Sequence, residues 1–373
     1  MKFAGSATLE GTEHFRNRFE GKIPAAHFRR SQGRWLSSIG IGTYLGSHDA
    51  ETDRLYQEAV VRAVESGCNV IDTAINYRFQ RSERSIGAAL RDLANRGFNR
   101  EEIVVATKGG FIPYDSEPPK DVRSYFDEAF VKPGIARVSD IIAGCHCMTP
   151  RYLLNQLDCS LSNLDLECVD IYYVHNPEMQ LGKISRQELS DRLLRAFEAL
   201  ESAVSAGKIG FYGTATWNGY RSEPTAKDYL SIADVMEAAI KAGGKSHHFK
   251  FIQLPLNLGM TEALSLANQE VQGKQLTLLQ SVEALGLTVM CSASILQGQL
   301  ARNLPSVISE TFEGLETDGQ RALQFVRSTP GVTTALVGMK QIQHVEENLT
   351  TARVPPAPWE QYSKLFHAAQ PNY

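Results

Sequence analysis

Apolar runs of strand length recur along the chain and alternate with longer segments in which apolar residues recur at helical spacing. Short apolar runs bounded by polar residues are typical of parallel strands that are buried on both faces. We predict strands at residues 39–43, 68–72, 103–108, 169–175, 209–213, 249–254, 287–292 and 332–337. We predict helices at residues 50–65, 82–94, 149–164, 185–206, 227–242, 274–285, 318–328 and 341–349. Eight such units in succession match the count that closes an α/β barrel of the (β/α)8 type, although a doubly wound sheet has the same periodicity.

Cap and turn residues mark the borders of these elements. Ser82 is the predicted N-cap of the second helix, and Ser185 and Glu188 form a capping box at the fourth. Residues 27–37 are typical of a β-hairpin that turns at Ser31-Gln32-Gly33. We expect an N-terminal extension at 1–26, a barrel at 27–352 that includes an insertion at 109–148, and a C-terminal tail at 353–373. The extension is polar and carries no chemical motif, so we expect it to lie on the surface or to reach a partner.

Four side chains that can carry protons lie at, or just beyond, the ends of three predicted strands. Asp72 ends the second strand, and Tyr77 follows it in a short polar turn. Lys108 ends the third strand and His175 ends the fourth. The C-terminal ends of parallel strands meet at one face of the fold, where such folds carry their active sites. Each residue alone would more often be a cap, a solvated charge or a packing residue, but together they predict an active site.

The segments that hold these residues, 70–77, 106–108 and 173–177, resemble the aldo-keto reductases. The resemblance extends from about residue 28 to residue 349 and implies a TIM barrel whose bottom is closed by a hairpin. It implies that Asp72, Tyr77, Lys108 and His175 are the catalytic group. Tyr77 would then be the general acid or base, with a pKa lowered by Lys108. Asp72 would pair with Lys108, and His175 would orient the carbonyl group.

The same resemblance implies a site for NADP(H) or NAD(H). Its expected residues are Gly42, Thr43, Tyr44, Asp72, Thr216, Gln253, Ser292, Gly338, Lys340, His344, Glu347 and Asn348. Gln253 matches the family's glutamine at the nicotinamide, and Glu347 and Asn348 match positions that hold the adenine. Lys340 and His344 lie near the positions that hold the 2′-phosphate in NADPH-using members. Because they fit either a phosphate contact or a solvated helix start, NADP and NAD both stay open.

The chain between Lys108 and His175 is longer than in the resembling family, and the extra residues are 109–148. In a barrel this insertion lies on the catalytic face, so we expect a lid or a substrate wall, with a structural appendage or a dimer contact as the alternative. The expected substrate contacts are Tyr77, His175, His146 and Trp217. We expect no metal at Cys145-His146-Cys147, because tetrahedral zinc needs four ligands at workable separations.

Composition narrows the functional class further. The chain has 373 residues, a net charge of -4 and 43% hydrophobic residues, which is ordinary for a globular protein. The absence of a polybasic cluster argues against a nucleic-acid partner, and no apolar run approaches the ~20 residues of a membrane span. The N-terminus meets polar residues too soon for a signal peptide. The 6 cysteines are few for this length, so we expect reduced thiols in a cytoplasmic protein.

We therefore predict an NAD(P)-dependent oxidoreductase that interconverts an alcohol and an aldehyde, ketone or sugar. Three alternatives stay open: a regulatory subunit that binds nicotinamide nucleotide and senses redox state, a sugar-modifying enzyme that uses retained NAD(P) for transient oxidation, and a non-redox barrel lyase or isomerase. The expected partner is a small-molecule substrate, and a homo-oligomer is also open.

Overall fold

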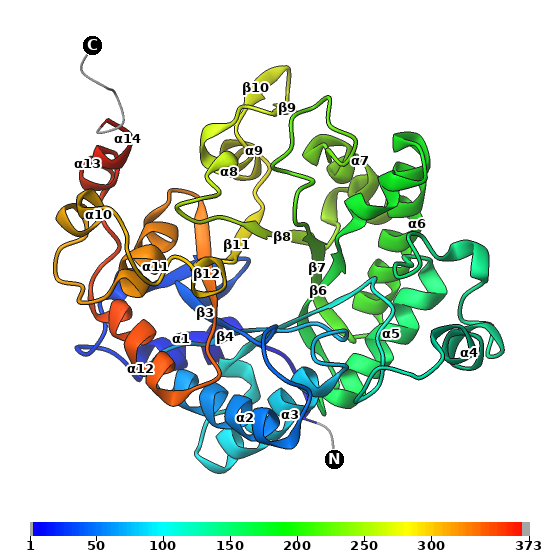
Figure 1. The fold of residues 1–373 in the computed structure, drawn as a ribbon, viewed down its shortest axis with the longest axis horizontal. Coiled ribbons are helices and arrows are strands. Elements are labelled where there is room, and N and C mark those ends of the chain that lie inside the picture. The colour runs from blue at the N-terminus through cyan, green and yellow to red at the C-terminus, as the bar shows by residue number, and fades with distance from the viewer. Residues whose placement is uncertain (1–2, 368–373) are drawn as a thin grey trace.

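The computed structural model describes residues 3–367, and its central element is the predicted barrel. Eight parallel strands close on themselves in the order β11-β12-β3-β4-β5-β6-β7-β8 (Figure 1). They are β3 (Ile39–Gly42), β4 (Val70–Asp72), β5 (Val104–Gly109), β6 (Val169–His175), β7 (Ile209–Ala215), β8 (Phe249–Pro255), β11 (Thr288–Ser292) and β12 (Val332–Gly338). The (β/α)8 prediction is confirmed, and the doubly wound alternative is excluded by the closure.

One helix follows each strand around the outside of the barrel (Figure 1). These helices are α2 (Ala50–Glu65), α3 (Arg81–Asn95), α5 (Pro150–Asn163), α6 (Arg186–Ser205), α7 (Ile232–Gly243), α9 (Leu278–Ala284), α11 (Asp318–Ser328) and α12 (Ile342–Thr350). Shorter helices lie in the extension, the insertion and the loops: α1 (Leu9–Asn17), α4 (Val122–Phe126), α8 (Glu262–Ser265) and α10 (Ser306–Thr311).

The helix predicted at 274–285 is wrong in its first part. Lys274–Leu276 is a strand, β10, which pairs antiparallel with β9 (Gln269–Val271). Helix α9 begins only after Thr277, whose hydroxyl accepts a hydrogen bond from the backbone N–H of Gln280. This cap separates the hairpin from the helix. The pattern of polar and apolar residues across 274–285 does not show that border.

Two other predicted helix starts also differ. The helix expected from residue 227 begins at Ile232, because Ser231 is its N-cap. Ser82 is not the N-cap of α3. Gln80 holds that position with a φ of 70°, and the Ser82 hydroxyl instead donates to the carbonyl of Thr43 at 2.7 Å. A tertiary acceptor on the neighbouring loop has replaced the local capping bond.

The apolar core forms two layers, one inside the barrel and one between the strands and the helices. Successive side chains on a strand point to opposite faces, so each strand contributes to both layers. The buried residues of the interior layer include Val70, Val104, Ala106, Ile171, Tyr173, Phe251, Met290 and Leu336. They fill the barrel, which leaves room for a ligand only at its ends.

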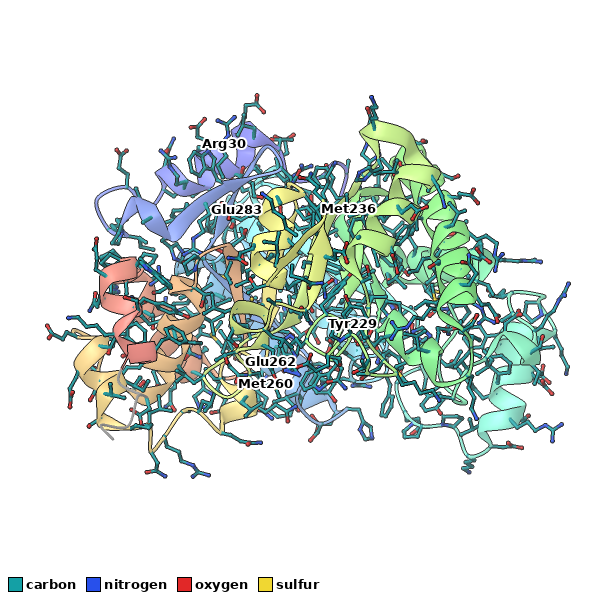
Figure 2. The ribbon with its side chains drawn as sticks, turned by 90° about the horizontal axis from the view of Figure 1, so that it is seen from above. Arg30, Tyr229, Met236, Met260, Glu262 and Glu283 are labelled. Carbon is teal, nitrogen blue, oxygen red and sulfur yellow. The ribbon has the colours of Figure 1, made fainter. Side chains whose placement is uncertain are left out.

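The two ends of the barrel are built differently. At one end, β1 (Phe28–Ser31) and β2 (Arg34–Ser37) form the predicted antiparallel hairpin, and Leu36 packs against the interior layer. Figure 2 places Arg30 of this hairpin at one end of the molecule and Met260 and Glu262, from the loop after β8, at the other. The loops that follow the strands are therefore on the face opposite to the hairpin.

The N-terminal segment differs from the expected surface extension. The side chain of Phe15 in α1 is fully buried, and its ring lies 6.1 Å from that of Phe28 in the hairpin. The backbone N–H of Ala7 donates to the Asp170 carboxylate at 2.6 Å. These contacts make the segment part of the hairpin end of the barrel, because its few aromatic residues find an apolar partner there.

His27 is buried at this same end, and its titration provides a test of the fold. Its ring nitrogens lie 3.0 Å from the Gly67 carbonyl and 3.0 Å from the Ser38 hydroxyl. Burial, followed by the charge of Arg327, lowers the pKa of His27 to about 3. The unfolded chain takes up this proton near pH 6.5, so the free energy of unfolding should fall as the pH drops from 6.5 towards 3.

Denaturant unfolding of the wild type and of His27→Gln across this pH range measures the effect. The variant should lose stability less steeply on acidification, because it has no imidazole to protonate. Equal pH slopes for the two proteins would contradict the assignment.

The C-terminal tail folds back on the barrel as far as it is described. It contains α13 (Trp359–Tyr362) and α14 (Lys364–His367). Tyr362 is buried, and its ring stacks on Phe325 of α11 at 5.2 Å. The ends of the expected extension and tail, residues 1–2 and 368–373, lie outside the described residues. Across residues 3–367, no helix combines the length and apolar character needed to cross a membrane.

Candidate active site

A cavity of about 880 Å³ opens at the ends of the strands. Gly42, Asp72, His175 and Ser292, at or near the last positions of their strands, are among the residues that line it. Its wall combines aromatic and other apolar side chains with polar ones. This is the composition expected of a small-molecule site, at the face where parallel barrels carry their chemistry.

A buried ion pair forms the floor of this cavity. The Lys108 ammonium lies 2.6 Å from Asp72 Oδ2 and 2.7 Å from the Thr73 carbonyl. The Gln253 amide donates to the other Asp72 oxygen at 2.7 Å. Burial lowers the pKa of Lys108, and the Asp72 charge opposes that shift. The pair is held in one geometry because both carboxylate oxygens have donors.

Tyr77 lies over this pair and is half-buried. The Lys108 ammonium is 4.9 Å from the centre of its ring. The ring also contacts Tyr44 at 5.0 Å and His175 at 5.9 Å, both edge to face. The turn that carries it places three residues in succession, Arg78 to Gln80, in the left-handed region. The structure therefore brings Tyr77 together with the three residues predicted to act with it.

The pKa of Tyr77 differs from the sequence-based expectation. Burial, then the charges of Asp72 and Tyr44, raise the pKa of Tyr77 well above its usual value of 10.0. The expected net lowering by Lys108 is wrong, because burial and the charge of Asp72, which pairs with the ammonium at 2.6 Å, outweigh its effect on Tyr77. Tyr77 is consequently a protonated phenol at neutral pH and can give a proton.

His175 completes the group as a neutral imidazole. Burial, followed by the charge of Lys108, lowers the pKa of His175 well below 6.5. Phe111 packs edge-on against its ring at 4.9 Å. Nδ1 of His175 is buried with no partner in the protein. Placing the single proton on Nε2 avoids a buried N–H without an acceptor, so we assign that tautomer.

Three residues that line the cavity carry a buried polar atom without a protein partner. These atoms are the side-chain oxygen of Asn76, Nδ1 of His175 and the hydroxyl of Thr216. Buried polar atoms are nearly always satisfied by protein, water or ligand. These three atoms belong to the end of β6 and to the loops after β4 and β7.

All twelve residues predicted to hold a nucleotide line this cavity. Gly42 and Gly338 face each other across β3 and β12. A Cβ atom at Gly42 would approach the protein no closer than 3.8 Å, and one at Gly338 no closer than 3.9 Å. The fold itself therefore tolerates a side chain at both positions. The open wall there can serve close approach of a ligand to the backbone.

The helix α12 supplies the charged end of the cavity. Lys340 and His344 line it near the start of the helix, as predicted. One carboxylate oxygen of Glu347 accepts from the Thr317 hydroxyl at 2.7 Å. Asn348 is buried beside them. A lysine, a histidine and a helix N-terminus at one end are suited to an anionic group such as phosphate.

Several lining residues escaped the sequence-based prediction. Phe111 lies in the insertion and touches both the cavity and His175. The loop after β11 contributes Ala293, Gln297 and Gly298, all with positive φ. The Gln297-Gly298 turn was the available signal for this loop, but turn residues predict a bend and not the direction in which it points.

His146 does not line the cavity, which corrects its predicted role as a substrate contact. It is fully buried behind His175, and its Nε2 lies 2.6 Å from the backbone carbonyl of that residue. Trp217, by contrast, lines the cavity and is 40% exposed. The insertion therefore contacts the site in two ways: Phe111 lines the cavity, and His146 packs on the side of His175 that faces away from it.

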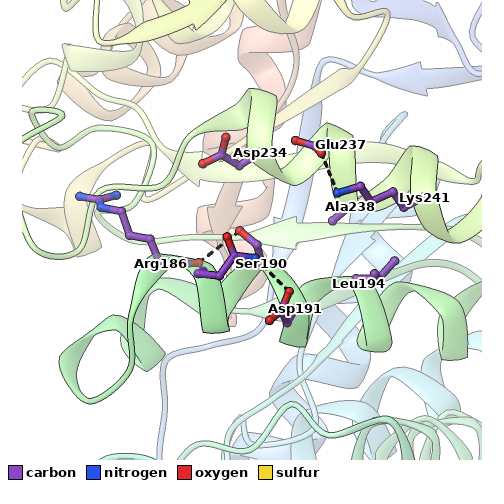
Figure 3. Close-up of a pocket in the computed structure, with 9 residues that line it drawn as sticks. Arg186, Ser190, Asp191, Leu194, Asp234, Glu237, Ala238 and Lys241 are labelled. Atoms are coloured by element: carbon purple, nitrogen blue, oxygen red, sulfur yellow. Dashed lines mark hydrogen bonds and ion pairs between the residues drawn. The ribbon is translucent and has the colours of Figure 1, made fainter.

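A second hollow, of about 220 Å³, lies between α6 and α7 on the outside of the barrel (Figure 3). Its wall is mostly charged, and Lys241 pairs with Glu237 at 2.6 Å within it. Arg186 donates to backbone carbonyls of the loop before α7, including that of Ala226 at 2.8 Å. These groups are occupied in helix and loop contacts, so the hollow presents no catalytic arrangement.

Comparison with known proteins gives a consistent family assignment. Residues 38–247 match the family model described as the Aldo/keto reductase family. A Schizosaccharomyces pombe protein named as a candidate voltage-gated potassium channel subunit beta is 24% identical over 91% of this chain and 90% of its own length. The aldo-keto reductase yakc [NADP(+)] of the same organism is 22% identical over 86% of this chain and 84% of its own.

Among solved structures, an aldo/keto reductase from Klebsiella pneumoniae in complex with NADP and acetate has the same fold. Its TM-score is 0.58 at 20% identity, covering 91% of this chain and 95% of that protein.

Proposed function

Because this chain belongs to the aldo/keto reductase family, we propose that it interconverts a carbonyl compound and an alcohol with Tyr77 as the general acid and base. The observation that carries the proposal is the convergence of four groups at one cavity. Tyr77 lies 4.9 Å, measured at its ring centre, from the Lys108 ammonium, which is paired with Asp72. The His175 ring is 5.9 Å from that of Tyr77 on the other side.

The cavity also fits a nicotinamide nucleotide. A bound nicotinamide nucleotide supplies the hydride, which no side chain carries. Gln253 and Thr216 would hold its nicotinamide end near Asp72, and Lys340 and His344 would hold the phosphate end. The unpartnered hydroxyl of Thr216 and the open backbone at Gly42 support this placement. The names of two similar proteins include NADP, in agreement with a phosphate at the cationic end.

Each member of the catalytic group has a distinct task in carbonyl reduction. The phenol of Tyr77 is protonated and gives its proton to the carbonyl oxygen. Lys108 then stabilises the phenolate, and Asp72 keeps Lys108 in place. Neutral His175 donates Nε2–H to the same oxygen and orients it. In alcohol oxidation the same groups act in reverse.

Turnover tests this function against the regulatory alternative. We expect oxidation of NADPH or NADH at 340 nm on adding at least one member of a panel of aldehydes, ketones and reducing sugars. Nucleotide binding without turnover over the whole panel would favour a redox-sensing regulatory subunit; one similar protein is named as a potassium channel subunit beta. Nucleotide that copurifies, resists dialysis and undergoes no net oxidation would favour transient oxidation of a sugar.

Lys340 should decide the preference between the two nucleotides. Replacing it by methionine is expected to weaken NADPH binding about tenfold and to change NADH binding little, because a charge-assisted bond to phosphate contributes roughly 1.5–3 kcal/mol. Titration of nucleotide fluorescence measures both affinities. Lys274→Met, which removes an exposed lysine of β10, is the matched control. Equal loss for both nucleotides would place Lys340 elsewhere than at the phosphate.

A further inference from the structure

We propose that the insertion 109–148 supplies a positioning residue, His146, which holds the backbone of His175 and so aims its imidazole at the substrate oxygen. This inference rests on the proposed function, because it assigns His175 the task of orienting the carbonyl. It gives the insertion a role behind the site, in addition to any contact with substrate.

The proton of His146 can be assigned from its two partners. Nε2 lies 2.6 Å from the backbone carbonyl of His175, and Nδ1 lies 2.8 Å from the side-chain nitrogen of Gln180. A carbonyl oxygen only accepts, so Nε2 must carry the proton. Nδ1 of the neutral ring then accepts from the Gln180 amide. Burial lowers the pKa of His146 to about 4, so this neutral form persists at neutral pH.

The chain of hydrogen bonds continues to the surface of α6. The oxygen of Gln180 accepts from Arg192 at 2.5 Å, which fixes the orientation of the amide. Arg192 in turn donates to Glu188 at 2.6 Å, within the same helix. A histidine, an amide and a guanidinium thus connect His175 to a rigid helix. Hydrogen bonds that satisfy the buried members of such a network restrict them to one arrangement.

The end of β6 explains why such a support is needed. On one side, pairing of β6 with β5 reaches only Val174, opposite Gly109, whereas on the other side His175 still pairs with Ala215 of β7. Asn176, which follows, has a φ of 46° in the left-handed region. His146 provides the carbonyl of His175 with the donor that β5 does not supply. Without it, this carbonyl would lose a hydrogen bond at a buried position.

The backbone of the insertion is shaped for this contact. Gly110 has a φ of +145°, and a Cβ atom there would lie 2.9 Å from His146 Nε2 and 2.9 Å from the His175 carbonyl oxygen. Any side chain at this position would enter the hydrogen bond itself. The backbone N–H of Cys147 donates to the Gly110 carbonyl at 2.8 Å, which locks His146 beside it. Glycine at this position is therefore required by the proposed contact.

The insertion also confines the ring of His175 from a second direction. The ring of Phe111 lies 4.9 Å from that of His175 and 5.4 Å from that of His146, edge to face in both cases. Phe111 and His146 are bridged as antiparallel neighbours. One hairpin-like segment thus holds both the backbone and the ring of His175.

The decisive experiment compares His146→Leu with the conservative His146→Gln in the full chain. Leucine removes the donor, whereas the glutamine amide can still donate to the carbonyl. We expect His146→Leu to lower kcat about tenfold or more, because small misplacement of a catalytic group is costly. His146→Gln should recover kcat to within about threefold of wild type. Nucleotide affinity should stay within about twofold of wild type in both variants, because residue 146 does not line the cavity that would hold the nucleotide.

Controls separate positioning from packing. Cys145→Ala, a substitution next to His146 in the same loop, should leave kcat and Tm unchanged. Equal losses of kcat and Tm in His146→Leu and His146→Gln would show that only packing matters, and unchanged kcat in both would equally overturn the proposal.

A measurement on the ligand-free chain does not depend on turnover. Histidine-selective ¹H–¹⁵N NMR should show His146 as the neutral Nε2–H tautomer, with its signal identified by loss in His146→Gln. An Nδ1–H tautomer would overturn the network. If the chain turned over no carbonyl but His146 had the expected tautomer, the proposed function would fail and the hydrogen bond would stand.

Discussion

Replacing Tyr77 by phenylalanine is expected to lower kcat at least about 100-fold, which is the effect of losing a positioned general acid. The substitution removes one hydroxyl and keeps the ring, whose contacts with Tyr44 and His175 at 5.0 and 5.9 Å should persist. Nucleotide affinity, measured by fluorescence titration, should therefore change little. Single-turnover kinetics would show whether the loss lies in the chemical step.

A matched substitution distinguishes chemistry from packing at the cavity. Tyr44→Phe removes a hydroxyl from the ring that packs against Tyr77, on a residue that is 57% exposed. Its kcat should stay within about threefold of wild type, because it has no proton to give to the carbonyl. Wild-type turnover by a folded Tyr77→Phe protein would rule out Tyr77 as the proton donor.

Replacing Lys108 by methionine is expected to abolish turnover and to destabilise the fold by about 3–5 kcal/mol. The lysine is fully buried and donates to Asp72 at 2.6 Å. Its loss leaves the Asp72 carboxylate buried, with the Gln253 amide as its remaining hydrogen-bond donor among the described residues. Breaking one half of a buried ion pair is costly for this reason, whatever the pair contributes in net terms. Urea unfolding measures the change in stability.

The double variant Asp72→Asn, Lys108→Met separates the two effects. It removes both charges, so most of the lost stability should return, while turnover should stay absent because no ammonium faces Tyr77. Restored turnover in the double variant would show that the ion pair is structural only. If Lys108→Met alone were as stable as the wild type, the Asp72 carboxylate would be shown to tolerate burial without its cation.

The strands of the barrel were predictable because their burial is nearly complete on both faces. A run such as Val169–His175 is buried at every position, so its composition leaves few other structures open. Helix starts were less predictable where a tertiary contact competes with a local one. Ser82 has the chemistry of a cap, but its hydroxyl bonds to Thr43, a residue 39 positions away. Such partners cannot be read from neighbouring residues.

The sequence predicted which residues meet at the candidate site better than it predicted their pKa values. Asp72, Tyr77, Lys108 and His175 meet because strand ends of a parallel barrel share one face. The direction of the Tyr77 pKa was not predictable, since it depends on burial and on how closely Asp72 neutralises Lys108. His146 was expected in the pocket and lies behind His175.

The sequence by itself determined the order of strands and helices, the face on which polar strand ends gather and the family to which the chain is similar. These depend on periodicity and on residues close together along the chain, which act through local backbone preferences and burial. Only the tertiary structure decided which residues pair with one another in hydrogen bonds, ion pairs and packing contacts. Three features depend on residues remote in sequence. They are the charges near Tyr77, the packing of the N-terminal segment on the hairpin, and the hydrogen bond from His146 to His175. Their energies depend on separations of a few ångströms, which no pattern along the chain encodes.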